Sequence, residues 1–198
     1  PNEVSVPSKI LGRLIGRTEP VEVTIDGGKL QAVQTASGSD IALAGVDCWI
    51  ASALLDVQVN GFAGVDFNSA GLSADAIWHA ITKLREKGVV LFCPTVITHS
   101  FEHLATCLGA LDRVCRDPLV ASYIPAIHLE GPWISREDGP RGAHPLEHVR
   151  NADWEEFLRL QESAGGRIGM VTLAPEVPDA LPVIERLVSA GVVVAIGH

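Results

Sequence analysis

The sequence predicts an α/β fold with a small β-rich segment, residues 1–52, followed by part of a (β/α)8 barrel, residues 53–198. The first fifty residues carry the alternation and turn residues typical of β-strands. From residue 53, five apolar runs alternate with amphipathic helical stripes, which is typical of a parallel sheet covered by helices. About 145 residues form this second part, whereas a closed eight-stranded barrel takes ~250. We therefore expect an incomplete barrel with about five strands.

The β-rich segment contains a predicted hairpin. Residues 21–25 alternate apolar and polar side chains, and Asp26-Gly27-Gly28 then supplies the positive φ angles of a tight turn. Residues 30–33 return as the second strand. A small and polar stretch over 35–39 predicts a loop, and a further short strand is expected near 48–50.

The second part alternates strands with helices. The apolar runs predicted as strands are residues 54–59, 89–97, 124–129, 168–173 and 192–196. The helical stripes between them begin near residues 77, 101, 154 and 184. Ser73 and Gly88 are expected to cap the first helix, and Asp153 with Glu156 resembles a capping box. The absence of G-x-G-x-x-G after the first strand disfavours a dinucleotide-binding sheet.

The composition excludes several classes of protein. With 15 Lys+Arg and 24 Asp+Glu the formal charge is −9, which disfavours nucleic-acid binding. No apolar run reaches the ~20 residues of a membrane helix, and no secretory signal is expected. The four cysteines lack zinc-finger or C-x-x-C spacing. We expect four reduced thiols in a cytoplasmic protein.

Polar residues follow every predicted strand. In both α/β architectures functional groups gather at the carboxyl ends of the strands, so these side chains are expected to converge on one mouth. The five segments are residues 56–61, 93–98, 128–132, 172–176 and 197–198.

The third strand carries the sharpest pattern. His128 and Glu130 are two residues apart, so they point to the same face, and both are costly to bury unless paired or bound to a metal. A buried ion pair or a hydrogen-bonded core histidine is the alternative. Glu130 together with His198 fits a divalent metal with mixed nitrogen and oxygen ligands. We expect His79, His99, His103 and His148 to be surface or helix-end residues.

An ordered set of short motifs points to one family. The motifs are L-D-V-Q-V-N-G-F-A-G-V-D-F from residue 55, C-P-T from 93, H-L-E-G-P-W from 128, G-A-H from 142, V-T-L-A-P-E from 171 and G-H from 197. Together they resemble N-acetylglucosamine-6-phosphate deacetylase of the amidohydrolase superfamily, over about residues 52–198. The resemblance implies the N-terminal portion of a metal-dependent barrel enzyme, with residues 1–52 as part of a small β-sandwich.

The resemblance also assigns site residues. It implies that Glu130 and His198 are metal ligands, and that the ion is zinc, with iron or manganese as alternatives. Gln58 and Asn60 stand where many amidohydrolases carry an H-x-H pair, which implies one metal per chain and a place for both residues near the substrate. His144 matches a loop histidine near the substrate, with a merely exposed loop histidine as the alternative. Arg141 is a candidate for contacting an anionic sugar.

The activity that the resemblance implies is hydrolysis of the acetamide of N-acetylglucosamine 6-phosphate, giving acetate and glucosamine 6-phosphate. The family's catalytic Asp and a further metal-binding His are expected beyond residue 198, so the isolated chain is expected to be inactive. A homodimer is expected for the complete protein. An unphosphorylated N-acetylated sugar or a cyclic amide is the alternative substrate, because a charge of −9 disfavours an anion at long range. A non-catalytic fragment or binding module is the second alternative.

Overall fold

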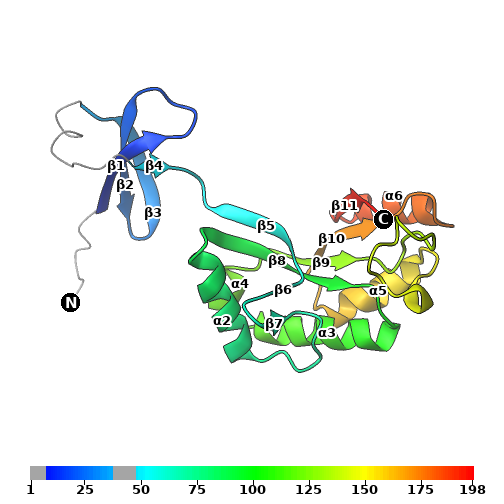
Figure 1. Ribbon diagram of the computed structural model, residues 1–198. Helices are drawn as coiled ribbons and strands as arrows, with labels where there is room; N and C mark the ends of the chain where they lie inside the picture. The colour runs from blue at the N-terminus through cyan, green and yellow to red at the C-terminus, as the bar shows by residue number, and fades with distance from the viewer. Residues whose placement is uncertain (1–7, 38–47) are drawn as a thin grey trace. The chain divides into compact units, whose positions relative to one another are not determined.

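The computed structural model describes residues 8–37 and 48–198 (Figure 1). The chain divides into two compact units, Pro1–Ser52 and Ala53–His198. Part of the predicted loop over 35–39 lies outside the described residues. Among the helices of the described ranges, none has the length and apolar character needed to cross a bilayer.

The first unit contains a four-stranded sheet in the order β3-β2-β1-β4. Its strands are β1 (Ser8–Leu14), β2 (Pro20–Asp26), β3 (Lys29–Thr35) and β4 (Trp49–Ile50). The predicted hairpin is confirmed, because β2 and β3 pair antiparallel and the turn residues Gly27 and Gly28 have φ of 55° and 73°. A second sheet that would complete a sandwich is not among the described residues, so the sandwich stays a prediction.

The second unit is built on five parallel strands in the order β11-β10-β9-β8-β5. The strands are β5 (Leu54–Val59), β8 (Val89–Ile97), β9 (Ile127–Glu130), β10 (Ile168–Leu173) and β11 (Val193–Ile196). Each strand pairs with the next one along the chain, whereas the order in a doubly wound sheet reverses at a switch point. The sheet curls as half of a barrel (Figure 1), which confirms the predicted fold class.

Four longer helices pack on one face of this sheet and form the core with it (Figure 1). They are α2 (Ala74–Arg85), α3 (Phe101–Val114), α5 (Trp154–Ser163) and α6 (Ala180–Ser189), and shorter turns form α4 (Pro118–Ala121) and η1 (Leu146–His148). Ser73 caps α2 by accepting from the Ala76 N–H, as predicted. On β9, Ile127 and Leu129 face this core, so the alternating residues His128 and Glu130 face the other side of the sheet.

Three local features differ from the sequence prediction. β9 begins at Ile127 rather than at 124, since Pro125 has no N–H to donate to a neighbouring strand. After β5 the chain forms a small hairpin, β6 (Gly61–Phe62) with β7 (Val65–Asp66), that the apolar pattern did not predict. Asp153 caps α5, but the Glu156 carboxylate is turned away and accepts from Arg150 and Trp133 instead.

Candidate functional site

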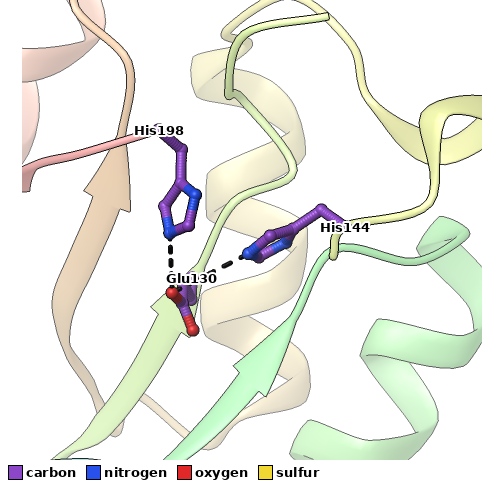
Figure 2. A group of neighbouring side chains, drawn as sticks. All are labelled: Glu130, His144 and His198. Carbon is purple, nitrogen blue, oxygen red and sulfur yellow. Dashed lines mark hydrogen bonds and ion pairs between the residues drawn. The ribbon is translucent and has the colours of Figure 1, made fainter. Parts of the chain in front are cut away.

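Polar side chains from several strand ends meet at the carboxyl edge of the five-stranded sheet. Glu130 is the last residue of β9, and His198 follows β11. His144 comes from the loop between β9 and η1, and Figure 2 shows both imidazoles turned toward the Glu130 carboxylate. Gln58, in β5, and Asn60, just after it, reach the same carboxylate. The structure therefore brings together the five residues that the resemblance assigned to the metal or placed near the substrate, whereas the further candidate Arg141 is held by its own loop.

One oxygen of Glu130 faces the two histidines. Its Oε1 lies 2.9 Å from His198 Nε2 and 3.8 Å from His144 Nε2 (Figure 2). One ligand atom from each of the three residues lies within 4.8 Å of the other two. Glu130 and His144 are buried, with 5% and 6% exposure, while His198 is partly exposed. The cluster is thus open on the His198 side.

The second oxygen of Glu130 is held by amides. Gln58 Nε2 donates to Oε2 at 2.9 Å, and Asn60 Nδ2 donates at 3.4 Å. An amide N–H group can donate but cannot accept, so this oxygen faces donors only. The carboxylate is therefore fixed in orientation, with Oε1 presented to the imidazoles.

The Glu130 carboxyl is held in its ionised form. Burial raises its pKa, but the hydrogen bonds with His144, His198 and Asn60 outweigh the burial and lower the pKa from 4.5 to about 2. A negative charge at this position is what a divalent cation requires from a carboxylate ligand.

The far nitrogen of each histidine is also anchored. His198 Nδ1 lies 3.1 Å from the carbonyl oxygen of Pro140, and His144 Nδ1 lies 2.8 Å from Thr98 Oγ1. Arg141 donates to the backbone oxygen of His144 and pairs with Asp138, so its guanidinium holds the loop. Partners of this kind orient metal-binding and substrate-binding histidines.

His128 is a buried structural histidine. Its Nδ1 lies 3.0 Å from the carbonyl oxygen of Val57, and its Nε2 lies 2.7 Å from Thr172 Oγ1. Burial lowers its pKa, so the neutral ring is favoured. The hydrogen-bonded core histidine that was the alternative for the H-L-E segment thus describes His128, whereas Glu130 belongs to the cluster.

Three further histidines form a half-buried stack outside the cluster. The His99 ring centroid lies 3.9 Å from that of His103 and 4.4 Å from that of His148. Burial lowers the pKa of His99, and the neighbouring His103 and His148 add to this shift. His79 is exposed. The stack was not foreseen, because His148 is 45 residues from His103 in the sequence.

An open hollow of about 790 Å³ lies away from the cluster, near the start of α5 and of α6. Several of its charged side chains are already engaged: Arg136 donates to the Val149 carbonyl oxygen, and Arg150 pairs with Glu156. Arg186 lies over the Trp154 ring. The convergence of acid and imidazole groups makes the Glu130 cluster the better candidate site.

Comparisons with known proteins show which enzymes the chain is similar to. The chain is 38% identical over 164 residues to N-acetylglucosamine-6-phosphate deacetylase of Danio rerio, covering 77% of this chain and 39% of that protein. It is 36% identical over 154 residues to the Bos taurus enzyme, covering 76% of this chain and 37% of that protein. No family model matches the chain.

Solved structures give the same result. A variant of N-acetyl-D-glucosamine-6-phosphate deacetylase from Mycobacterium smegmatis, in complex with N-acetyl-D-glucosamine-6-phosphate, matches with a TM-score of 0.80 at 29% identity. That match covers 98% of this chain and 50% of that one. The chain spans less than half the length of the curated relatives it matches. By sequence and by fold, the chain is homologous, over part of their length, to the N-acetylglucosamine-6-phosphate deacetylases, which are amidohydrolases.

Proposed function

We propose that this chain belongs to a metal-dependent deacetylase that hydrolyses the acetamide of N-acetylglucosamine 6-phosphate to acetate and glucosamine 6-phosphate. The observation that carries the proposal is the convergence of Glu130, His144 and His198 at the carboxyl edge of the sheet. The named relatives, one of them with that sugar phosphate bound, support the choice of substrate.

The residues of the cluster fit a divalent metal ion. A carboxylate and imidazole nitrogens are the mixed ligands that zinc accepts, and iron and manganese accept them too. His198 has an accepting oxygen at each nitrogen, Pro140 O and Glu130 Oε1, so a ring with a proton on both nitrogens satisfies both. Glu130 and His198 would hold the ion, with His198 Nε2 as the nitrogen ligand. We propose one ion per chain, with zinc first.

The residues around the ion have separate tasks. A divalent ion, when bound, supplies a Lewis acid and makes water at the site more acidic. Glu130 and His198 hold the ion, and the amides of Gln58 and Asn60 fix the Glu130 carboxylate. Each amide keeps a second N–H and an oxygen with which to contact the sugar. His144 faces the acetamide oxygen, where negative charge develops during amide hydrolysis.

Proton transfer needs a further group. No aspartate of the described residues is part of the Glu130 cluster. The relatives are more than twice as long as the region they share with this chain. We propose that the aspartate which moves a proton from water to the leaving amine lies in sequence that this match does not cover.

The oligomeric state and the cellular location of the protein are two further parts of the proposal. We propose a homodimer for the complete protein, on the family resemblance alone. We also propose a cytoplasmic location, supported by four free thiols, three of them buried. Light scattering of the purified protein and cell fractionation test these two statements.

The test of the function is an assay for released acetate with phosphorylated and unphosphorylated N-acetylglucosamine, after loading with zinc. The assay uses a chain of the relatives' length that contains these residues, and the 198-residue chain in parallel. A preference for the phosphorylated sugar supports the proposal. A preference for the unphosphorylated sugar favours another substrate, and metal binding without hydrolysis in the longer chain overturns the deacetylase assignment.

A further inference from the structure

We propose that Thr98 is a positioning residue that keeps the imidazole of His144 as a hydrogen-bond donor, with the ring proton on Nε2. The assignment of the proton rests on the geometry alone. Its catalytic meaning rests on the proposed function, in which His144 faces the acetamide oxygen.

The first support is the surroundings of the Thr98 hydroxyl. Thr98 is fully buried and follows directly after β8. Its Oγ1 lies 2.8 Å from His144 Nδ1 and 3.4 Å from the backbone oxygen of Glu130, which already accepts from the Thr98 N–H at 3.0 Å. A hydroxyl has one proton, which it can direct to Nδ1 at 2.8 Å or to the Glu130 backbone oxygen at 3.4 Å, and the shorter contact is the better hydrogen bond. Thr98 therefore donates to Nδ1.

The second support is at the opposite end of the ring. His144 Nε2 lies 3.8 Å from Glu130 Oε1, an oxygen of the carboxylate whose other oxygen accepts from Gln58 and Asn60. An N–H directed at a negative oxygen is attracted to it, whereas a nitrogen lone pair is repelled. Both ends of the imidazole thus favour the same form, with Nδ1 accepting and Nε2 carrying the proton.

The third support is the space left for the hydroxyl. A Cβ placed on Gly131 would lie 2.1 Å from Thr98 Oγ1, at a φ of +75°. The lack of a side chain at Gly131 thus lets the hydroxyl sit between β8 and the chain leaving β9. Thr98 thus packs against Gly131 and is hydrogen-bonded through its N–H to the backbone oxygen of Glu130.

The position of the ring proton gives His144 a different role from the metal ligands of the cluster. A nitrogen that carries a proton cannot give its lone pair to a metal, so His144 is a donor rather than a third metal ligand. A donor held in place before reaction is suited to the oxygen on which charge develops. Thr98 acts only through His144 and does not touch the substrate.

The direct test is nitrogen NMR of the 198-residue chain labelled with ¹⁵N-histidine, without metal and after addition of zinc. Signals of His144 are identified by their loss in His144→Gln. We expect a protonated Nε2 and an unprotonated Nδ1 in both states. A proton on Nδ1, or loss of the Nε2 proton on addition of zinc, overturns the proposal.

Two substitutions test the role of the hydroxyl. Thr98→Val has nearly the same shape but cannot donate, and Thr98→Ser keeps the hydroxyl. We expect Thr98→Val alone to shift the His144 signals to a mixture of both ring forms, while the affinity for zinc stays within twofold. Thr106→Val, at an exposed hydroxyl on α3, is the control for replacing a threonine by a valine away from His144. Unchanged His144 signals in a folded Thr98→Val variant contradict the proposal.

The kinetic consequence is measured in the chain that releases acetate. Loss of a partner that orients a functional histidine costs about 10- to 100-fold in activity. We expect this loss in kcat with little change in KM for Thr98→Val, and recovery in Thr98→Ser. If no chain releases acetate, the deacetylase assignment fails, while the NMR result still decides the role of Thr98.

Discussion

Glu130 Oε1 and His198 Nε2 lie 2.9 Å apart although 68 residues separate them in the chain. Glu130 ends β9 and His198 follows β11, and β10 lies between these two strands. The contact therefore joins strands that are not neighbours in the sheet. The contact forms because parallel strands end at one edge and because the sheet curls. The predictions below use this cluster and the residues that support it.

The charge of Glu130 is expected to decide metal binding. Glu130→Gln keeps the volume and removes the charge, leaving His198 as the remaining proposed ligand. Removing a residue that only supports a ligand costs 10- to 100-fold in affinity, so removing a ligand is expected to cost at least ~100-fold. Titration calorimetry with zinc measures this. Glu162→Gln, at an exposed position of α5, is the control and is expected to bind zinc as the parent chain does.

The same carboxyl predicts a pH dependence of stability. Its pKa is lowered from 4.5 to about 2 in the folded chain. The ionised form therefore stabilises the fold above pH ~4.5, and this contribution is lost as the pH falls from ~4.5 toward ~2. Its size is about 3 kcal/mol. Urea unfolding of the metal-free chain is measured between pH 2 and 6 for the parent and for Glu130→Gln. The difference between their free energies of unfolding is expected to show this loss. A difference that does not vary with pH contradicts the assignment.

Gly131 is expected to tolerate no side chain. In Gly131→Ala the new Cβ meets the Thr98 hydroxyl and also has a positive φ. Gly139 has a φ of +95° but nothing within 4 Å of its Cβ position, so Gly139→Ala reports the backbone strain alone. We expect Gly131→Ala to lower the free energy of unfolding by ~1–3 kcal/mol more than Gly139→Ala does. Equal losses mean that the hydroxyl moves aside without cost.

The pair of the partly exposed Arg150 and the buried Glu156 is expected to matter for stability. Arg150 Nε donates to both Glu156 oxygens at 3.0 Å, and its Nη1 donates to the carbonyl oxygens of His99 and His148. Arg150→Met leaves the Glu156 carboxylate buried with only Trp133 to donate to it.

We expect Arg150→Met to cost ~3–5 kcal/mol in the free energy of unfolding, because the buried Glu156 carboxylate is left without its cation. Arg116→Met removes an arginine that is 73% exposed and is expected to cost less than ~1 kcal/mol. Urea unfolding of both variants at pH 7 makes the comparison. Similar small costs mean that water reaches Glu156 and replaces the guanidinium.

Most of the second unit could be predicted from the sequence because its elements have clear periods. The run over Val89–Ile97 and the stripe of α2 with Ser73 at its start were predicted correctly. Features set by tertiary contacts were not. The side chain of Glu156 has the spacing of a capping box, but the Arg150 guanidinium is the better partner in the fold.

The candidate site shows the same division. The motifs named the five residues of the candidate site. The rule that parallel strands end at one edge placed four of them together, whereas His144, in a loop, came from the resemblance alone. Neither gave the partner of each atom. Thr98 and His144 are 46 residues apart, and nothing in the segment 93–98 or the G-A-H segment indicates that they make a hydrogen bond. Such a contact depends on loop paths and rotamers, which periodicity does not encode.

The order of the five parallel strands has a consequence for synthesis of the chain. Each new strand adds beside the one made before it, so the sheet can grow in step with the ribosome. The Glu130 cluster cannot form in the same gradual way, because it joins β5, the first strand, to the residue that follows β11, the last. Ion binding by a nascent chain would therefore mark the moment at which the whole half-barrel has been translated and has folded.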